Sequence, residues 1–185
     1  MRALILFMGL LALPGCDRQS GGGSQADRPG SPESAAPATP RAGLDRSQAG
    51  KPAPDVSFRD GQGDETSLAE FMGKPVLVNL WATWCAPCVK ELPTLARLAD
   101  RQDRVEVLAL SQDMRDPQEV AAFLAERSID LPPLQDNRME MSSAVGATIL
   151  PTTLLYGSDG REIWRYTGDL DWTGAEAAKL LGEAR

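Results

Sequence analysis

The sequence has 185 residues, which suits one domain with tails, and its formal net charge is −7. This acidic balance argues against nucleic acid as a partner, because nucleic acids favour basic surfaces. The chain contains no histidine, so hydrolases that pair serine or cysteine with histidine are excluded and the commonest metal ligand is missing.

Residues 1–15 have the pattern of a secretory signal peptide, because Arg2 is followed by an apolar run that is too short to cross a bilayer comfortably. The run ends in Leu13-Pro14-Gly15-Cys16, which resembles a bacterial lipobox. That resemblance implies a lipid on Cys16, which would become the mature N-terminus and anchor the protein to a membrane. The alternative is an ordinary signal peptide with an incidental cysteine. Asp17 resembles a retention signal for the inner membrane, which implies a lipid-anchored protein on its periplasmic face.

Residues 16–53 are rich in glycine, proline, alanine and serine and contain few large apolar side chains. Such a stretch cannot bury enough surface to offset the entropy of ordering it, so we expect a disordered tether. Coil statistics give this tether an end-to-end distance of roughly 30–35 Å. An unselected low-complexity spacer is the other interpretation. The globular domain is expected to cover residues 54–185.

The first half of the domain predicts alternating strands and helices. The expected elements are, in chain order, a strand at 55–58, a turn at 59–64, a short helix at 67–71, a strand at 76–81, a helix at 87–99 and a strand at 105–110. Ser67 and Glu70 fit a capping box at the start of the short helix. The alternation favours parallel strand pairing with helices on both faces of a sheet.

The second half of the domain predicts helices and a hairpin. The expected elements are a helix that begins at Pro117, a short helix at 139–145, strands at 152–156 and 162–166, and a last helix at 173–184. Residues 157–160, Gly-Ser-Asp-Gly, are typical of the turn that joins two antiparallel strands. Thr173 is the expected N-cap of the last helix.

Cys85 and Cys88 stand at the junction between the expected strand at 76–81 and the helix that follows it. The reactive form of cysteine is the thiolate, and the free amides and dipole at a helix N-terminus stabilise that anion. We therefore expect Cys85 to be the attacking nucleophile. Cys88 lies one turn further on, close enough to form a disulfide with Cys85 and to resolve a mixed disulfide with a substrate. Pro87 fits the first helical turn, where a missing N–H costs nothing.

Two other readings of the cysteine pair are weaker. If the pair were part of a zinc site, it would supply two of the four ligands, and a second pair of cysteine or histidine ligands would be needed. This chain has no such second pair. A purely structural disulfide with two residues between the cysteines closes too small a ring to restrain much of the unfolded chain. We therefore expect no metal and no bound cofactor, with the Cys85–Cys88 disulfide as the redox group.

A family resemblance rests on two motifs. Asn79-Leu80-Trp81-Ala82-Thr83-Trp84-Cys85-Ala86-Pro87-Cys88 resembles the active site of the thioredoxin superfamily, and Val89-Lys90-Glu91-Leu92-Pro93 resembles its TlpA, ResA and CcmG branch of exported, membrane-anchored disulfide reductases. Ile149-Leu150-Pro151-Thr152-Thr153 resembles the second hallmark of the superfamily. The resemblance implies a thioredoxin-like α/β fold, with a central mixed β-sheet flanked by helices, an N-terminal strand extension and a core insertion over 113–145.

The resemblance also implies roles for single residues. Pro151 is expected to follow a cis peptide bond and to lie against the disulfide, and the backbone of Leu150 is expected to pair with a bound substrate. Trp84 is expected to shield the sulfur atoms and to offer an apolar platform to substrates. Ala86 and Pro87 complete the active-site loop as supporting residues.

Asn79 departs from the superfamily pattern, since cytoplasmic thioredoxins carry a buried aspartate at this position. Asparagine cannot accept the proton of Cys88, so water, a carboxylate such as Glu91, or no internal base takes that role. Glu91 itself is expected to be a solvated helix residue, as most helical glutamates are.

The remaining large side chains are expected to fill the interior. Trp81 is assigned to the core, and Trp164 and Trp172 have no reading beyond packing. The methionines of the domain's second half are likewise expected to be core filling, and they are Met114, Met139 and Met141.

The expected function is the reduction of disulfides in exported proteins. An oxidising compartment requires a donor to keep the pair reduced, so a membrane-embedded thiol donor is the expected electron source. A thiol oxidant or isomerase is the first alternative, although strong oxidants of the superfamily carry histidine between the cysteines and Ala86-Pro87 supplies no charge. Cytochrome or oxidase maturation is one candidate role, but Thr152 stands where some cytochrome-maturation members carry an acidic residue.

Two further alternatives fit less well. A peroxiredoxin-like peroxidase needs threonine three residues before its cysteine, and Thr83 lies two residues before Cys85. A copper chaperone is disfavoured by the missing histidine.

Overall fold

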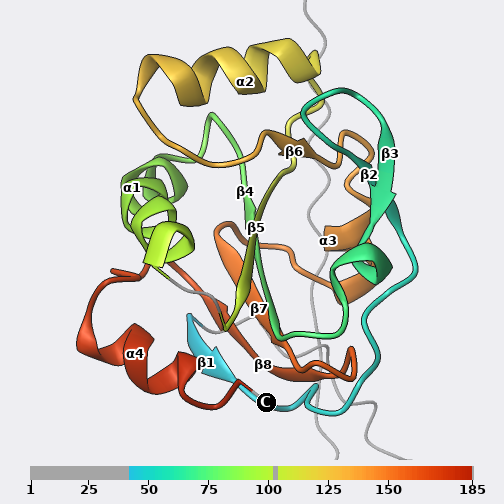
Figure 1. Ribbon diagram of the computed structural model, residues 1–185, viewed down its shortest axis with the longest axis vertical. Helices are drawn as coiled ribbons and strands as arrows, with labels where there is room; N and C mark the ends of the chain where they lie inside the picture. Colours follow the sequence, from blue (N-terminus) through green and yellow to red (C-terminus); the bar gives the residue numbers. More distant parts are fainter. Residues whose placement is uncertain (1–41, 102–103, 185) are drawn as a thin grey trace, which may run out of the picture. The chain divides into compact units, whose positions relative to one another are not determined.

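The computed structural model describes residues 42–101 and 104–184. They form a sheet with the strand order β1-β8-β7-β4-β5-β6-β2-β3 (Figure 1). The strands are β1 (Gly43–Asp45), β2 (Ser57–Arg59), β3 (Glu65–Ser67), β4 (Val76–Trp81), β5 (Glu106–Ser111), β6 (Leu134–Gln135), β7 (Thr152–Tyr156) and β8 (Glu162–Thr167). The helices are the 3-10 helix η1 (Leu68–Phe71) and the α-helices α1 (Ala86–Arg101), α2 (Pro117–Glu126), α3 (Glu140–Val145) and α4 (Ala175–Leu181).

Strand β4 lies at the centre of the sheet, and all six of its residues are buried. It pairs in parallel with β5 and antiparallel with β7, so the sheet is mixed. Successive side chains of a strand point to opposite faces. Leu77 and Trp81 accordingly belong to one hydrophobic cluster and Val76, Val78 and Leu80 to the other.

The two clusters explain which helices cover which face. The cluster around Trp81 includes Leu92 and Leu95 of α1 and Leu180 of α4. The opposite cluster includes Leu68 of η1 and Met141 of α3. Figure 1 shows the same division, with α1 and α4 on one side of the sheet and α3 on the other. The α/β fold and the mixed sheet expected from the sequence are confirmed.

The N-terminal boundary of the domain differs from the prediction. Strand β1 pairs antiparallel with β8, and Pro52 forms a β-bridge with Arg161. The tether predicted over 16–53 is therefore wrong for its C-terminal part, and the domain begins before Pro54. Composition misled here because backbone pairing at a sheet edge needs no large apolar side chain. The predicted signal peptide, Cys16 and the rest of the predicted tether lie outside the described residues.

Helix caps also depart from the expected pattern. Ser67 forms no side-chain cap on η1, so the expected capping box is wrong. Helix α4 has Gly174 as its N-cap, because the Thr173 side chain instead donates to Asp171 Oδ1 at 2.6 Å. The expected start at Pro117 is confirmed, with Asp116 accepting from the Gln118 N–H at 2.8 Å.

The expected insertion over 113–145 contains α2, β6 and α3. Strand β6 pairs in parallel with β5 and antiparallel with β2, and thereby joins the β2–β3 hairpin to the central sheet. The turn expected at 59–64 is the connection of this hairpin. Within residues 42–101 and 104–184, no helix combines the length and the apolar character that a membrane span requires.

Candidate active site

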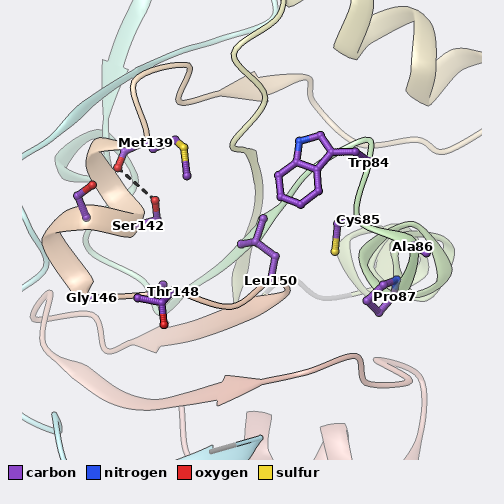
Figure 2. A pocket seen from close by; sticks show the side chains of 11 residues that line it. Trp84, Cys85, Ala86, Pro87, Met139, Ser142, Gly146, Thr148 and Leu150 are labelled. Carbon is purple, nitrogen blue, oxygen red and sulfur yellow. Dashed lines mark hydrogen bonds between the residues drawn. The ribbon is translucent and has the colours of Figure 1, made fainter. Parts of the chain in front are cut away.

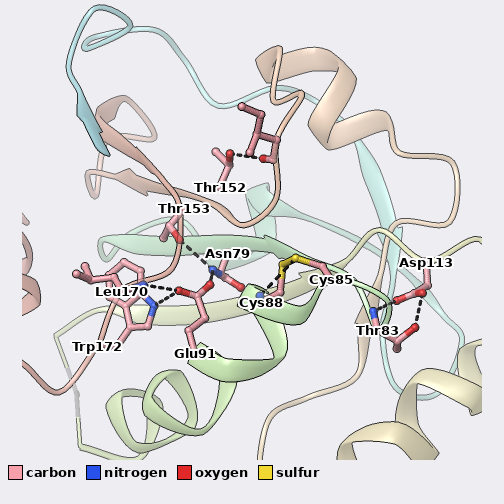
Figure 3. The surroundings of a disulfide bond; sticks show 11 residues. Asn79, Thr83, Cys85, Cys88, Glu91, Asp113, Thr152, Thr153, Leu170 and Trp172 are labelled. Carbon is pink, nitrogen blue, oxygen red and sulfur yellow. Dashed lines mark hydrogen bonds between the residues drawn. A yellow bond between two sulfur atoms is a disulfide. The ribbon is translucent and has the colours of Figure 1, made fainter. Parts of the chain in front are cut away.

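Cys85 and Cys88 form a disulfide with an S–S distance of 2.03 Å, at the point where the chain leaves β4 and enters α1 (Figure 3). The carbonyl of Cys85 accepts the N–H of Val89 at 3.0 Å, and the Cys88 N–H donates to Cys85 Sγ at 3.4 Å. A first-turn amide thus points at the sulfur atom, as the sequence predicts. Cys85 is 6% exposed and Cys88 is 0% exposed, so only Cys85 can be reached from outside.

A buried carboxylate holds the loop before Cys85. Asp113 Oδ2 accepts the Thr83 N–H at 2.8 Å, and Oδ1 accepts the Thr83 hydroxyl at 2.7 Å (Figure 3). Oδ2 also accepts the Ser111 hydroxyl at 2.8 Å. Asp113 follows β5, the parallel neighbour of β4. No sequence motif pointed to a role for this residue. The available signal was its position, because the carboxyl ends of neighbouring parallel strands meet at one edge of a sheet.

A groove of about 730 Å³ opens beside Cys85 (Figure 2). The active-site loop lines one side of it, with Trp84, Cys85, Ala86 and Pro87. Helix α3 and the segment after it line the other side, with Met139, Ser142, Ser143, Gly146, Ala147, Thr148 and Leu150. Trp84 is 66% exposed, so its indole forms an open apolar wall rather than a lid over the sulfur atoms.

The far wall of the groove is also held by a carboxylate. Asp136 is buried, and its oxygens accept the N–H groups of Glu140 at 3.0 Å and Met141 at 2.8 Å. These are free first-turn amides of α3, and a short helix needs such partners. Asp136 therefore fixes the start of α3, whose residues Ser142 and Ser143 line the groove.

The Leu150–Pro151 peptide bond is cis, as the resemblance implies. Leu150 lines the groove on the side that faces Trp84 and Cys85 in Figure 2. Pro151 is buried, and its carbonyl accepts the Gly168 N–H at 2.9 Å. The two residues thus join the groove to the start of β7.

Glu91 is buried, 2% exposed, which contradicts the expectation of a solvated helix residue. Its Oε1 accepts from Asn79 Nδ2 at 2.7 Å, and its Oε2 accepts the Leu170 N–H at 3.0 Å and Trp172 Nε1 at 3.1 Å (Figure 3). Helix spacing brings Glu91 onto the same buried face of α1 as Cys88, three residues earlier. Asn79, which departs from the superfamily pattern, is thus paired with Glu91, because its amide supplies a donor that a buried glutamate needs.

Burial raises the pKa of Glu91 from its ordinary value of 4.5 to about 7, and the nearby charge of Asp169 acts in the same direction. The hydrogen bonds from Leu170, Asn79 and Trp172 oppose this rise, because they stabilise the ionised form. Glu91 therefore gains or loses a proton near neutral pH. Histidine is the side chain that ordinarily titrates in this range, and in this chain, which has no histidine, Glu91 does so instead.

Asn79 occupies the centre of this buried polar cluster. Its Nδ2 also donates to Thr153 Oγ1 at 2.9 Å, and its Oδ1 is buried with no hydrogen-bond partner in the structure. The side chain links β4 to β7 and holds the Glu91 carboxylate at the same time. Asparagine at position 79 therefore has a structural explanation: it donates to Glu91, which an ionised aspartate at this position could not do.

Other expectations for large side chains are partly wrong. Trp81 is in the core as expected, but Trp172 does more than pack because it donates to Glu91. Met141 is core, whereas Met114 is 81% exposed and Met139 lines the groove. Among the described residues, no group of three or more Cys, Asp or Glu side chains has the arrangement of a metal site.

The fold and the cysteine pair at the head of α1 define a thioredoxin-like thiol–disulfide oxidoreductase. The sequence model of the Redoxin family matches residues 48–181, and the chain belongs to this family. It is 33% identical over 127 residues to the thiol-disulfide oxidoreductase ResA of Bacillus thuringiensis subsp. konkukian, a match covering 68% of this chain and 73% of the relative. It is also 33% identical over 116 residues to the thioredoxin-like protein YneN of Bacillus subtilis, covering 61% and 68%.

Solved structures share the fold. StoA from Bacillus subtilis superposes with a TM-score of 0.58 at 24% identity, covering 71% of this chain and 100% of StoA. A thiol:disulfide interchange protein DsbE from Chlorobium tepidum superposes with a TM-score of 0.65 at 22% identity, covering 72% and 96%.

The raised pKa of Glu91 predicts a pH dependence of stability. A carboxyl whose pKa rises from 4.5 to about 7 on folding stabilises the folded state fully below the lower value and loses that stabilisation as pH rises through the higher one. Between about pH 4 and about pH 8, the unfolding free energy of wild type should fall by about 3 kcal/mol relative to Glu91→Gln. Urea unfolding of the oxidised proteins measures the difference. If the unfolding free energies of the two proteins change with pH in parallel, the prediction is wrong and folding does not raise the pKa of Glu91.

Proposed function

We propose that this protein reduces disulfides in exported proteins, with the Cys85–Cys88 pair as its redox group and no bound cofactor. The observation that carries the proposal is the unequal exposure of the two sulfur atoms. Cys85 faces the groove, whereas Cys88 is fully buried one turn into α1. This arrangement suits attack by Cys85 on an external disulfide and resolution by Cys88 from the interior.

The reaction starts from the dithiol form. The Cys85 thiolate attacks one sulfur of the substrate disulfide, the substrate S–S bond breaks, and the other substrate sulfur leaves as a thiolate that takes up a proton. Cys88 then loses its proton and attacks Cys85, which releases the second substrate thiolate. Two electrons pass to the substrate, and the enzyme is left with its Cys85–Cys88 disulfide.

Glu91 is the proposed acceptor of the Cys88 proton. The carboxylate lies on the same buried face of α1, one turn beyond Cys88, and its pKa of about 7 lets it hold a proton without binding it irreversibly. Two of its donors, Asn79 and Trp172, hold it in place from β4 and from the segment after β8. In this scheme the proton that Cys88 loses passes to a residue of this chain rather than directly to water.

The groove is the proposed substrate site. Trp84 offers an exposed aromatic face beside Cys85, while Ala86 and Pro87 add small apolar surface at the head of α1. Leu150 lies across the groove, and its backbone, next to the cis bond of Pro151, is the proposed partner for an extended substrate chain. Such backbone pairing tolerates many sequences, which suits a protein that acts on polypeptides.

The two-cysteine scheme predicts the behaviour of single variants. Cys85→Ser should abolish disulfide reduction, because no reachable thiolate remains. Cys88→Ser should accumulate mixed disulfides between Cys85 and its substrates, because the resolving thiol is missing. Non-reducing electrophoresis and mass spectrometry of the adducts from intact cells measure this and identify the substrates. Cys85→Ser is the control and should form no adducts. If the Cys88→Ser protein forms no more adducts in cells than this control, the two-cysteine scheme is excluded.

The proposed direction is reduction, with a membrane-embedded thiol donor that returns electrons to the pair. Ala86 and Pro87 place no charge between the cysteines that would stabilise the reduced thiolate. We expect a reduction potential close to that of thioredoxin, about −270 mV, in equilibrium with a glutathione buffer. Pro87→His should raise the potential, because an imidazolium stabilises the thiolate. A wild-type value at or above that of the glutathione pool would reverse the proposed direction.

The proposed location is the periplasmic face of the inner membrane, with a lipid on Cys16 after removal of residues 1–15 as a signal peptide. The basis is the motif Leu13-Pro14-Gly15-Cys16. We expect wild type in the membrane fraction and Cys16→Ser in the soluble exported fraction, because the acylation site is gone. Cys88→Ser is the matched control and should remain in the membrane. Equal partition of wild type and Cys16→Ser would exclude the lipid anchor.

A further inference from the structure

The segment Gly168–Trp172, between β8 and α4, contacts both halves of the proposed site. Its Gly168 N–H donates to the Pro151 carbonyl at 2.9 Å. Its Leu170 N–H and its Trp172 indole N–H both donate to Glu91 Oε2, at 3.0 and 3.1 Å (Figure 3). One short segment therefore joins the cis-proline to the buried carboxylate.

Helix α1 holds this segment at two further points. Lys90 Nζ forms an ion pair with Asp169 at 2.7 Å, and Thr94 Oγ1 accepts the Trp172 N–H at 3.2 Å. Trp172 is itself buried. Because its backbone is fixed by Thr94 and its indole by Glu91, the ring has little freedom to leave the carboxylate.

The hydrogen bonds from Gly168–Trp172 to Glu91 all favour the same protonation state of this carboxyl. Indole and amide N–H groups can only donate, so each bond favours the ionised form of Glu91, whereas burial favours the neutral form. The protonation of Glu91 therefore depends on a balance, and Gly168–Trp172 supplies both donors on one of the two carboxylate oxygens.

We propose that Trp172 is a positioning residue that holds Glu91 Oε2 and sets the pH range in which this carboxylate exchanges a proton with Cys88. The inference rests on the proposed function, in which Glu91 accepts that proton. The part played by Gly168–Trp172 goes beyond that function.

The charged and titratable groups around Glu91 come from three elements. Lys90 stands on α1 itself, Asp169 on the connecting segment and Tyr166 on β8, where Tyr166 has a raised pKa chiefly because of burial. Strands β4 and β7 contribute the neutral side chains Asn79 and Thr153. Asp169 acts in the same direction as burial, so the opposition to burial comes from the N–H donors of Leu170, Asn79 and Trp172, in that order.

The experiment titrates the Glu91 carboxyl by NMR in the oxidised full-length protein with carbon-13-labelled glutamate. The wild-type midpoint should lie at about 7. Trp172→Phe keeps the buried ring but removes the donor, so the midpoint should rise by about one pH unit. Trp164→Phe is the matched control, because Trp164 is equally buried but donates to the Leu180 carbonyl at 3.2 Å. Its midpoint should equal that of wild type.

A second variant keeps the inference testable if Trp172→Phe does not fold. Thr94→Val removes the acceptor of the Trp172 N–H and should shift the midpoint in the same direction by a smaller amount, whereas Thr94→Ser should restore the wild-type value. In the reduced proteins, the pH profile of thiol–disulfide exchange should move with the midpoint, and Trp172→Phe should have no effect on that profile when combined with Glu91→Gln.

The outcomes separate the inference from the proposed function. Wild-type midpoints in both Trp172→Phe and Thr94→Val would overturn the role of Trp172 and leave the reductase scheme intact. Shifted midpoints with an unmoved exchange profile would also overturn it, because Glu91 would then not exchange a proton in the reaction. Failure of Cys88→Ser to trap substrates would overturn the proposed function while the midpoint in the oxidised form still reports on Trp172.

Discussion

The geometry of the site depends on the three-residue spacing along the first two turns of α1. Cys85 stands at the head of the helix, Cys88 one turn in and Glu91 one turn further. Because helix residues three apart share a face, the three groups form a line from the groove into the core. The outermost sulfur can be reached, the second is sealed, and the carboxylate beyond it is held by donors from two other parts of the fold.

Two more carboxylates give the groove its shape, and both follow parallel strands. Asp113 comes after β5 and fixes the loop before Cys85, and Asp136 comes after β6 and fixes the start of α3. Asp113 satisfies one backbone N–H and Asp136 satisfies two, all at partly or fully buried positions where a missing partner is costly. The insertion over 113–145 thus begins with a residue that supports the loop before Cys85 and later builds the opposite wall of the groove.

The sequence was most informative where one local pattern determines the structure. The apolar run of β4, the cysteine pair at the head of α1 and the motif around Pro151 could all be predicted from short segments. What could not be predicted depends on distant partners. Glu91 is buried because Leu170 and Trp172, far along the chain, supply its donors, and β1 exists because β8 offers an open edge. No pattern around Glu91 or Leu44 alone carries that information.

The complete burial of Cys88 has a consequence for chemical damage. Cysteine oxidation beyond the sulfenic acid is irreversible in most proteins, and susceptibility follows exposure. An oxidant that enters the groove meets only Cys85, and a sulfenic acid formed there has a thiol one helical turn away with which to condense. The product is the ordinary disulfide of the catalytic cycle. Accidental oxidation of Cys85 therefore ends in the reversible Cys85–Cys88 disulfide rather than in an irreversible sulfinic acid.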